Sequence, residues 1–300
     1  MSQRISILVL TLALAHSSAT DASGAEGRRS LLPQEVLALM ERAIANQHRN
    51  DAALEEYERL ERRLERKRSK DESVAEDKTF RVSPTGTGAL RLLVEENGQP
   101  VNPEFYRKQL RDWEQALVWA LDPNEPRQKR RVEKWAKRSR ERAELVDAVR
   151  EAFRFTWLGN DFLDGRTLVK FRLDPQPGFK PHSRNTQLLS NVRATLWIDE
   201  PAAQVAKLEA EIIHDISFGG GVAGKVYHGG RFAMEQIEVA QGIWLPSRYQ
   251  FEFEGRKFLF GFEVHEAIKV RGYRSIGPPS QALAVVRREL NNTQPANPAR

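Results

Sequence analysis

Apolar and polar residues alternate through most of the second half of the chain, beginning at Phe153. Side chains at every second position lie on one face of a β-strand, so this pattern predicts strands. The alternating apolar sets are Phe153, Phe155 and Trp157; Thr167, Val169, Phe171 and Leu173; Val192, Ala194, Leu196 and Ile198; Ala206, Leu208, Ala210 and Ile212; Tyr249, Phe251 and Phe253; Phe258, Phe260, Phe262 and Val264. Short turns separate these sets without an intervening helix, which predicts antiparallel connections and excludes a parallel βαβ fold for this half.

The first half begins with a helical pattern and becomes ambiguous after Asn50. From Leu31 the apolar residues Val36, Leu37, Met40 and Ile44 fall on one helical face, which predicts an amphipathic helix. Residues 54–68 fit either a solvated, charged helix or a long charged strand. The spacing alone leaves both alternatives open.

A strand pattern and then a second helical region follow. From Thr79 the period is two, and the apolar run Leu90 to Val94 ends at the turn dipeptide Asn97-Gly98. Residues 103–150 are predicted to be helical and crowded with charge, with a hairpin tip at residues 122–124. After Ile276 we expect a loosely held, Pro-containing tail (276–300) with one short helical stretch.

The N-terminus has the pattern of a secretory signal peptide. Arg4 precedes an apolar run from Ile5 to Ala15, which is too short to span a bilayer core of ~30 Å. Small residues place the cleavage site near Ala19 or Ala15, and residues 20–30 form a linker. The alternative is an uncleaved N-terminal anchor. Export without any cysteine favours a bacterial periplasm.

Composition and motifs argue against an enzyme. The chain of 300 residues has a formal net charge of +6, which favours acidic partners. Gly219, Gly221 and Gly224 match phosphate-loop spacing, but Val226 stands where a P-loop needs Ser or Thr, so we expect a flexible connection. The histidines lack metal-site spacing, and no serine lies in a G-x-S-x-G motif. We therefore predict a non-enzymatic protein without cofactor, metal or nucleic-acid partner.

The strongest electrostatic feature is a basic stretch within the second helical region. Nine Lys or Arg residues and two acids lie between residues 127 and 142. The first interpretation is a solvated helix with apolar contacts at Val132, Trp135 and Ala136. The second is a surface for anionic membrane lipid. Its candidate residues are Arg127, Lys129, Arg130, Arg131, Lys134, Lys137 and Arg138.

Several short sequence segments, taken in their order along the chain, resemble those of a known family. They are Arg91 to Gly98 (RLLVEENG), Leu196 to Asp199 (LWID), Phe218 to Gly221 (FGGG), Gly242 to Ser247 (GIWLPS) and Tyr273-Arg274. Over residues 50–275 the chain resembles the secreted bacterial LolA-like, or outer-membrane lipoprotein-sorting, proteins. The resemblance implies an α+β fold, in which a curved antiparallel sheet forms an incomplete barrel and helices cover its concave face. It also favours a strand for residues 54–68, within one domain spanning 31–275 that carries a helical hairpin insertion at about 103–150.

The resemblance further implies a periplasmic carrier that holds lipid acyl chains or a lipoprotein in an apolar cavity. One helix and one helical hairpin are expected to cover the aromatic face of the sheet. The candidate lining residues are Phe153, Phe155, Trp157, Phe171, Phe251, Phe253, Phe258, Phe260 and Phe262. The alternative is an envelope scaffold or sensor domain, whose aromatics form a filled core and whose basic helix recruits a partner.

Overall fold

The computed structural model describes residues 31–67, 74–163, 165–183, 185–218, 223–258 and 260–292. The predicted signal peptide and linker, most of the glycine-rich stretch (219–222) and the end of the predicted tail (293–300) lie outside the described residues.

Four α-helices and thirteen strands make up the described chain. In order they are α1 (Pro33–Leu54), β1 (Tyr57–Arg66), β2 (Val74–Pro84), β3 (Ala89–Glu96), β4 (Gln99–Pro100), α2 (Pro103–Leu121), α3 (Pro126–Ala152), β5 (Phe153–Leu163), β6 (Arg166–Pro175), the 3₁₀ helix η1 (Thr186–Asn191), β7 (Val192–Asp199), β8 (Gln204–Ile212), β9 (Ile216–Phe218), β10 (Gly224–Val226), β11 (Arg231–Ala240), β12 (Ile243–Lys257), β13 (Phe260–Ser275) and α4 (Pro279–Asn292). Each α-helix begins with proline, whose fixed φ suits the first helical position and whose missing N–H costs nothing there.

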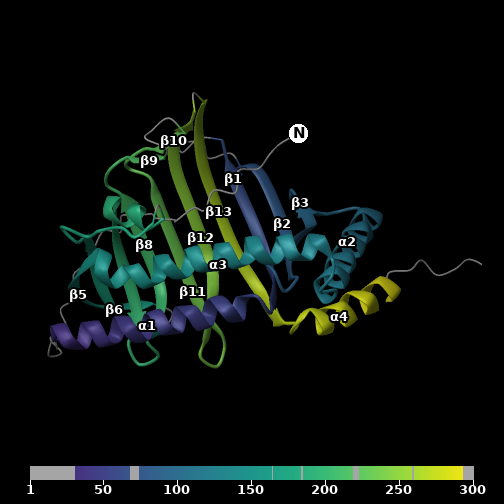
Figure 1. Cartoon of the computed structure of the whole chain (residues 1–300), viewed down its shortest axis with the longest axis horizontal. Helices are drawn as coiled ribbons and strands as arrows, with labels where there is room; N and C mark the ends of the chain where they lie inside the picture. The colour runs from purple at the N-terminus through teal and green to yellow at the C-terminus, as the bar shows by residue number, and fades with distance from the viewer. Residues whose placement is uncertain are drawn as a thin grey trace, which may run out of the picture.

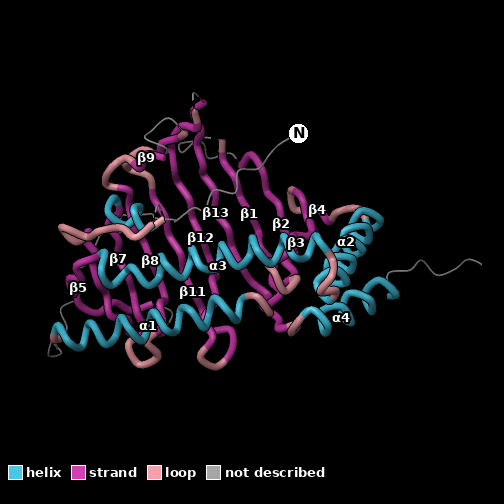
Figure 2. The backbone as a smooth tube through the Cα atoms, in the orientation of Figure 1, coloured by secondary structure: helices cyan, strands magenta, loops and turns pink. Residues whose placement is uncertain are grey.

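All strands belong to one open antiparallel sheet. Its main path runs β4-β3-β2-β1-β13-β12-β11-β8-β7-β6-β5, with β10 paired to β12 and β9 paired to β10. The sheet curves, and helices α1 and α3 lie across one side of it (Figures 1 and 2). The α+β prediction with an unclosed antiparallel sheet is confirmed, and residues 57–66 form a strand rather than a helix.

We call the side covered by α1 and α3 the inner face. Residues directly opposite one another in an antiparallel pair point to the same side. The register therefore brings Phe155, Leu173, Ala194 and Ala210 together, and farther along the sheet Phe232, Phe251 and Glu266. The main hydrophobic core lies between this face and the two helices.

A smaller core lies on the outer face near β3. Leu92 packs there with Leu110, Trp113 and Leu117 of α2 and with Val286 of α4. Two predictions are corrected by this arrangement. Only one arm of the 103–150 hairpin, α3, covers the inner face, because the apolar stripe of α2 is matched by the outer face. The described part of the tail is not loosely held, since α4 buries Ala282 and Val286.

Candidate functional site

Six of the nine predicted lining residues come together on the inner face. Phe153, Phe171 and Phe253 are buried in the main core. Phe155, Trp157 and Phe251 pack against the same core but remain half-buried. The alternation of these strands thus correctly predicted a shared aromatic face. The half-buried members are the part of that face that the helices cover least.

The other three predicted residues lie toward the tip of the β12–β13 hairpin. Phe262 is half-buried opposite Gly255, on the inner side of the sheet. Phe258 and Phe260 are exposed, so the structure does not bring them into the group of rings that packs in or against the main core. The reason is geometric: at the hairpin tip the sheet extends past the part of α3 that packs against it.

An aromatic row on β11 and β12 forms the centre of the inner face. Phe232 lies against Tyr249 and Phe251, with ring centroids 6.3 and 5.9 Å away. Phe251 in turn meets Phe253 edge to face at 6.5 Å. Burial raises the pKa of the Tyr249 hydroxyl to about 12, so this ring is neutral. Sequence analysis missed Phe232, although its alternation with Met234 was a detectable strand signal.

Helices α1 and α3 cover this row unequally. Helix α1 packs its apolar stripe against the core along much of its length, through Val36, Leu39, Met40 and Ala43. Helix α3 contributes Leu145, Ala148 and Ala152, all near its C-terminus. Its N-terminal half carries exposed side chains, including Val132. Half of α3 therefore supplies nothing to the main core.

The inner face becomes charged where it reaches β1. Glu61 is buried there and accepts hydrogen bonds from Arg59 (Nε to Oε1, 3.0 Å), Arg63 (Nη2 to Oε2, 3.3 Å) and Arg91 (Nε to Oε2, 3.2 Å). Burial raises the pKa of the Glu61 carboxyl, but the three guanidinium groups outweigh it and hold the pKa below its ordinary value. This cluster was missed because the spacing of residues 54–68 fitted a helix as well as a strand, so it assigned no face to their side chains.

The predicted basic residues all lie on α3, in its N-terminal half. Six are exposed, namely Arg127, Lys129, Arg130, Lys134, Lys137 and Arg138, and Arg131 is half-buried. The guanidinium of Arg127 lies 4.7 Å from the ring centroid of Trp119, which ties the start of α3 to the end of α2. The other exposed cations lie on the part of α3 that does not pack into the core.

The described residues contain no group of three or more His, Asp or Glu side chains able to hold a metal ion. Within the same residues, no helix is long and apolar enough to cross a membrane. The inner face offers apolar contact through its aromatic row and charge through the cluster around Glu61.

No protein-family model and no curated protein matches the chain. Solved structures with a similar arrangement include a LolA superfamily protein from Nitrosomonas europaea, with 10% identity, TM-score 0.30, and coverage of 82% of this chain and 96% of that one. A putative outer membrane lipoprotein-sorting protein domain from Vibrio parahaemolyticus has 10% identity, TM-score 0.31, and coverage of 83% and 100%. A DUF1329 family protein from Desulfovibrio piger has 10% identity, TM-score 0.27, and coverage of 80% and 93%. The first two structures carry the name of the family that the sequence resembles.

Proposed function

We propose that this chain is a periplasmic, non-enzymatic binding protein that holds an acyl chain of a lipid or lipoprotein against the inner face of its sheet. The observation that carries the proposal is the group of half-buried aromatics Phe155, Trp157 and Phe251, which extend the main core to a surface that α1 and α3 cover incompletely. An acyl chain laid on such a surface gains ~0.8 kcal/mol for each buried CH₂ group.

The polar chemistry beside these rings supports an acylated ligand. The indole Nε1 of Trp157 is buried and has no hydrogen-bond partner among the described residues. A buried donor without a partner costs free energy, and the carbonyl of an acyl ester or amide would accept its hydrogen bond. A plain hydrocarbon would leave that nitrogen unsatisfied.

The exposed cations of α3 give the proposal a second part. Lys129, Arg130, Lys134 and Lys137 lie outside the core, where they can meet the head groups of an anionic membrane. Each such residue near an anionic surface contributes ~1 kcal/mol of attraction. We propose that they bring the protein to the membrane from which it takes its cargo.

The first test is to isolate the mature protein from a periplasmic extract without detergent and measure its native mass before and after organic extraction. We expect an extractable mass that corresponds to a lipid or an acylated peptide. A native mass equal to that of the protein alone, unchanged after incubation with lipid vesicles, would contradict the proposed carrier function. It would favour the scaffold or sensor alternative.

The second test uses charged replacements on β5. Phe155→Asp combined with Trp157→Asp should abolish uptake of an environment-sensitive fatty-acid probe, because two carboxylates would then line the acyl surface. Phe162→Asp is the matched control, since Phe162 lies on the same strand but is 70% exposed. Unchanged uptake by a folded double variant would contradict the assignment of this surface as the acyl-binding site.

A further inference from the structure

Three exposed phenylalanines lie at the tip of the β12–β13 hairpin and at the end of β9, which is joined to β12 through β10. Phe260 is 77% exposed, Phe258 55% and Phe218, on the neighbouring β9, 42%. The tip stands beyond the helices at the top of the sheet (Figure 1). Large apolar side chains gathered at one projecting end of a molecule are typical of a docking surface.

Phe258 has an unusual backbone for an aromatic residue. Its φ is +54°, a left-handed conformation that side chains with a Cβ rarely adopt. Two contacts hold it: its N–H donates to Ala223 O (3.3 Å), and Arg256 Nη1 donates to its carbonyl oxygen (2.8 Å). Glycine would fit this turn without strain, and the exposed ring gains little from packing. The aromatic side chain at this position therefore indicates a role in binding rather than in the stability of the fold.

The exposed rings are continuous with the proposed acyl-binding surface. Lys257 is directly opposite Phe260 in the register, and both belong to the same side of the sheet as Gly255 and Phe262. A Cβ on Gly255 would lie 2.7 Å from the Phe262 ring, so this ring lies across the glycine.

Two residues further along the same side, Phe253 is opposite Val264. Phe253 belongs to the main core, and Val264 packs against it. Ile216 connects the neighbouring strand in the same way, because it is buried in that core two residues before Phe218. An apolar path thus runs from the inner face to the tip.

Cations flank these rings. Lys257 is exposed at the tip, and Arg256 and Lys225 are opposite each other on β12 and β10. Lys225 is held by Asp215 (Nζ to Oδ2, 2.6 Å). Aromatic rings with Lys and Arg around them match an interface that is apolar below and negatively charged above, as an anionic bilayer is.

We infer that this tip, formed by Phe218, Phe258, Phe260 and Lys257, inserts into the surface of an anionic phospholipid bilayer and is the point where acyl chains pass between membrane and inner face. The inference rests on the proposed function for the passage of acyl chains. The insertion of the tip into the bilayer is inferred from the residues of the tip alone.

The experiment is co-sedimentation of the mature chain with phosphatidylglycerol–phosphatidylcholine vesicles. Phe258→Gly with Phe260→Ser should lower the partition coefficient about tenfold or more, since it removes two rings from the bilayer interface. The glycine relieves the strained turn, so this variant should fold. Phe162→Ser is the matched control, because it removes an equally exposed ring from the far edge strand β5, and we expect no change in partition.

Two further arms separate this inference from the proposed function. The tip variant should still bind a monomeric fatty-acid probe, and the Phe155→Asp, Trp157→Asp variant should still partition onto vesicles. Lys257→Glu should weaken partition onto anionic vesicles and leave partition onto pure phosphatidylcholine unchanged. Equal partition of the tip variant and the wild type would overturn the inference. Absence of vesicle binding by the wild type would also overturn it and assign the tip to a protein partner.

Discussion

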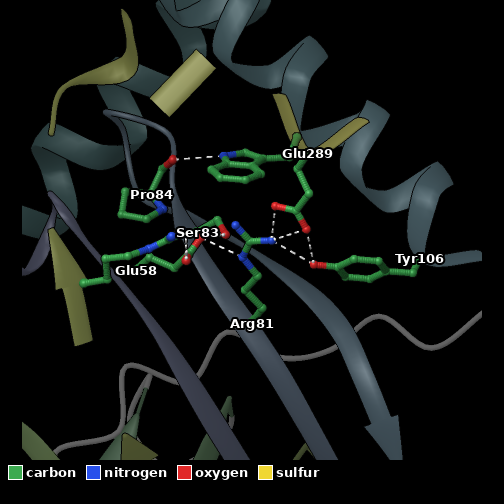
Figure 3. Close-up of polar contacts among 8 residues, drawn as sticks. Glu58, Arg81, Ser83, Pro84, Tyr106 and Glu289 are labelled. Carbon is green, nitrogen blue, oxygen red and sulfur yellow. Dashed lines mark hydrogen bonds and ion pairs between the residues drawn. The ribbon is translucent and has the colours of Figure 1, made fainter. Parts of the chain in front are cut away.

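Arg81 on β2 and Glu289 on α4 form a close ion pair, with Nη1 2.7 Å from Oε2, although 208 residues separate them in the chain. The Nε of Arg81 donates to Glu58 (2.6 Å, Figure 3). Its guanidinium lies 5.0 Å from the ring centroid of Trp113. Burial lowers the pKa of this guanidinium, but its bonds to carboxylates outweigh that effect and raise it. One side chain therefore joins the sheet, α2 and α4.

Removal of Arg81 should destabilise the protein strongly. Arg81→Ala leaves the buried carboxylate of Glu58 with Ser83 and the more exposed Arg274 as partners, and breaking a buried ion pair costs about 3–5 kcal/mol. Urea unfolding followed by circular dichroism measures this loss. Arg62→Ala is the matched control, because Arg62 pairs with Asp77 on the same two strands but is half exposed, so the cost should stay below about 1 kcal/mol. Equal costs for the two variants would show that Arg81 does not organise the outer core.

The buried Glu61 should give the protein an acid-sensitive component of stability. Its folded-state pKa lies below the ordinary value of 4.5, so it contributes stability above that pH, which is lost as the pH falls through the folded pKa. Glu61→Gln should therefore be less stable than the wild type near neutral pH, and the difference should shrink below 4.5. Urea unfolding at several pH values between about 7 and 3 measures it.

Glu266 on the neighbouring strand provides a control of opposite sign. Burial raises the pKa of its carboxyl, so its charged form opposes folding as the pH rises. The stability of Glu266→Gln relative to the wild type should increase with pH. If the stabilities of the two variants relative to the wild type change in the same direction with pH, the opposite pKa shifts assigned to Glu61 and Glu266 are wrong.

Period-two patterns in the sequence predicted the aromatic strands well because most of their apolar residues, such as Phe153, Phe171 and Phe253, are buried on one side. The placement of α2 could not be predicted in the same way. Its stripe of Leu110, Trp113 and Leu117 is apolar whichever face it covers. The packing of α2 against Leu92 and the contact of Trp113 with Arg81 place this helix on the outer face. Both contacts join segments that are distant in the sequence.

The candidate site shows the same limit. Phe155 and Phe260 look alike in an alternating pattern, yet the first packs on the core and the second is exposed. The difference depends on how far the strands extend past α1 and α3 (Figure 1). No local sequence pattern encodes that distance. The cluster around Glu61 was hidden for another reason: its charges fit a solvated helix as well as a buried strand face.

A buried amide network should fix the end of α1 to the sheet. Asn50 accepts a hydrogen bond from the backbone N–H of Trp244 (3.0 Å) and donates to Oε1 of Gln204 (2.8 Å). Asn50→Ala leaves both groups buried without their partner, at a cost of about 1–3 kcal/mol for each. Thermal or urea unfolding measures it. Glu41→Ala, on the same helix in an exposed pair with Arg150, should cost under about 1 kcal/mol, and a comparable loss would contradict this role of Asn50.

Acyl chains should bind to the inner face faster when α3 can move away from it, because the C-terminal half of α3 packs into the core beside the proposed acyl-binding surface. Asp51 on α1 and Arg142 on α3 form an ion pair (Oδ1 to Nη1, 3.3 Å) that marks where the two helices meet. The chain has no cysteine, so Asp51→Cys with Arg142→Cys can be joined by a short, cleavable bis-maleimide. We expect slower uptake of a fatty-acid probe in stopped-flow fluorescence, with recovery after cleavage. A linked Arg62→Cys, Asp77→Cys pair on β1 and β2 should leave the rate unchanged. An unaltered rate in the linked α1–α3 variant would mean that acyl chains enter without displacing α3.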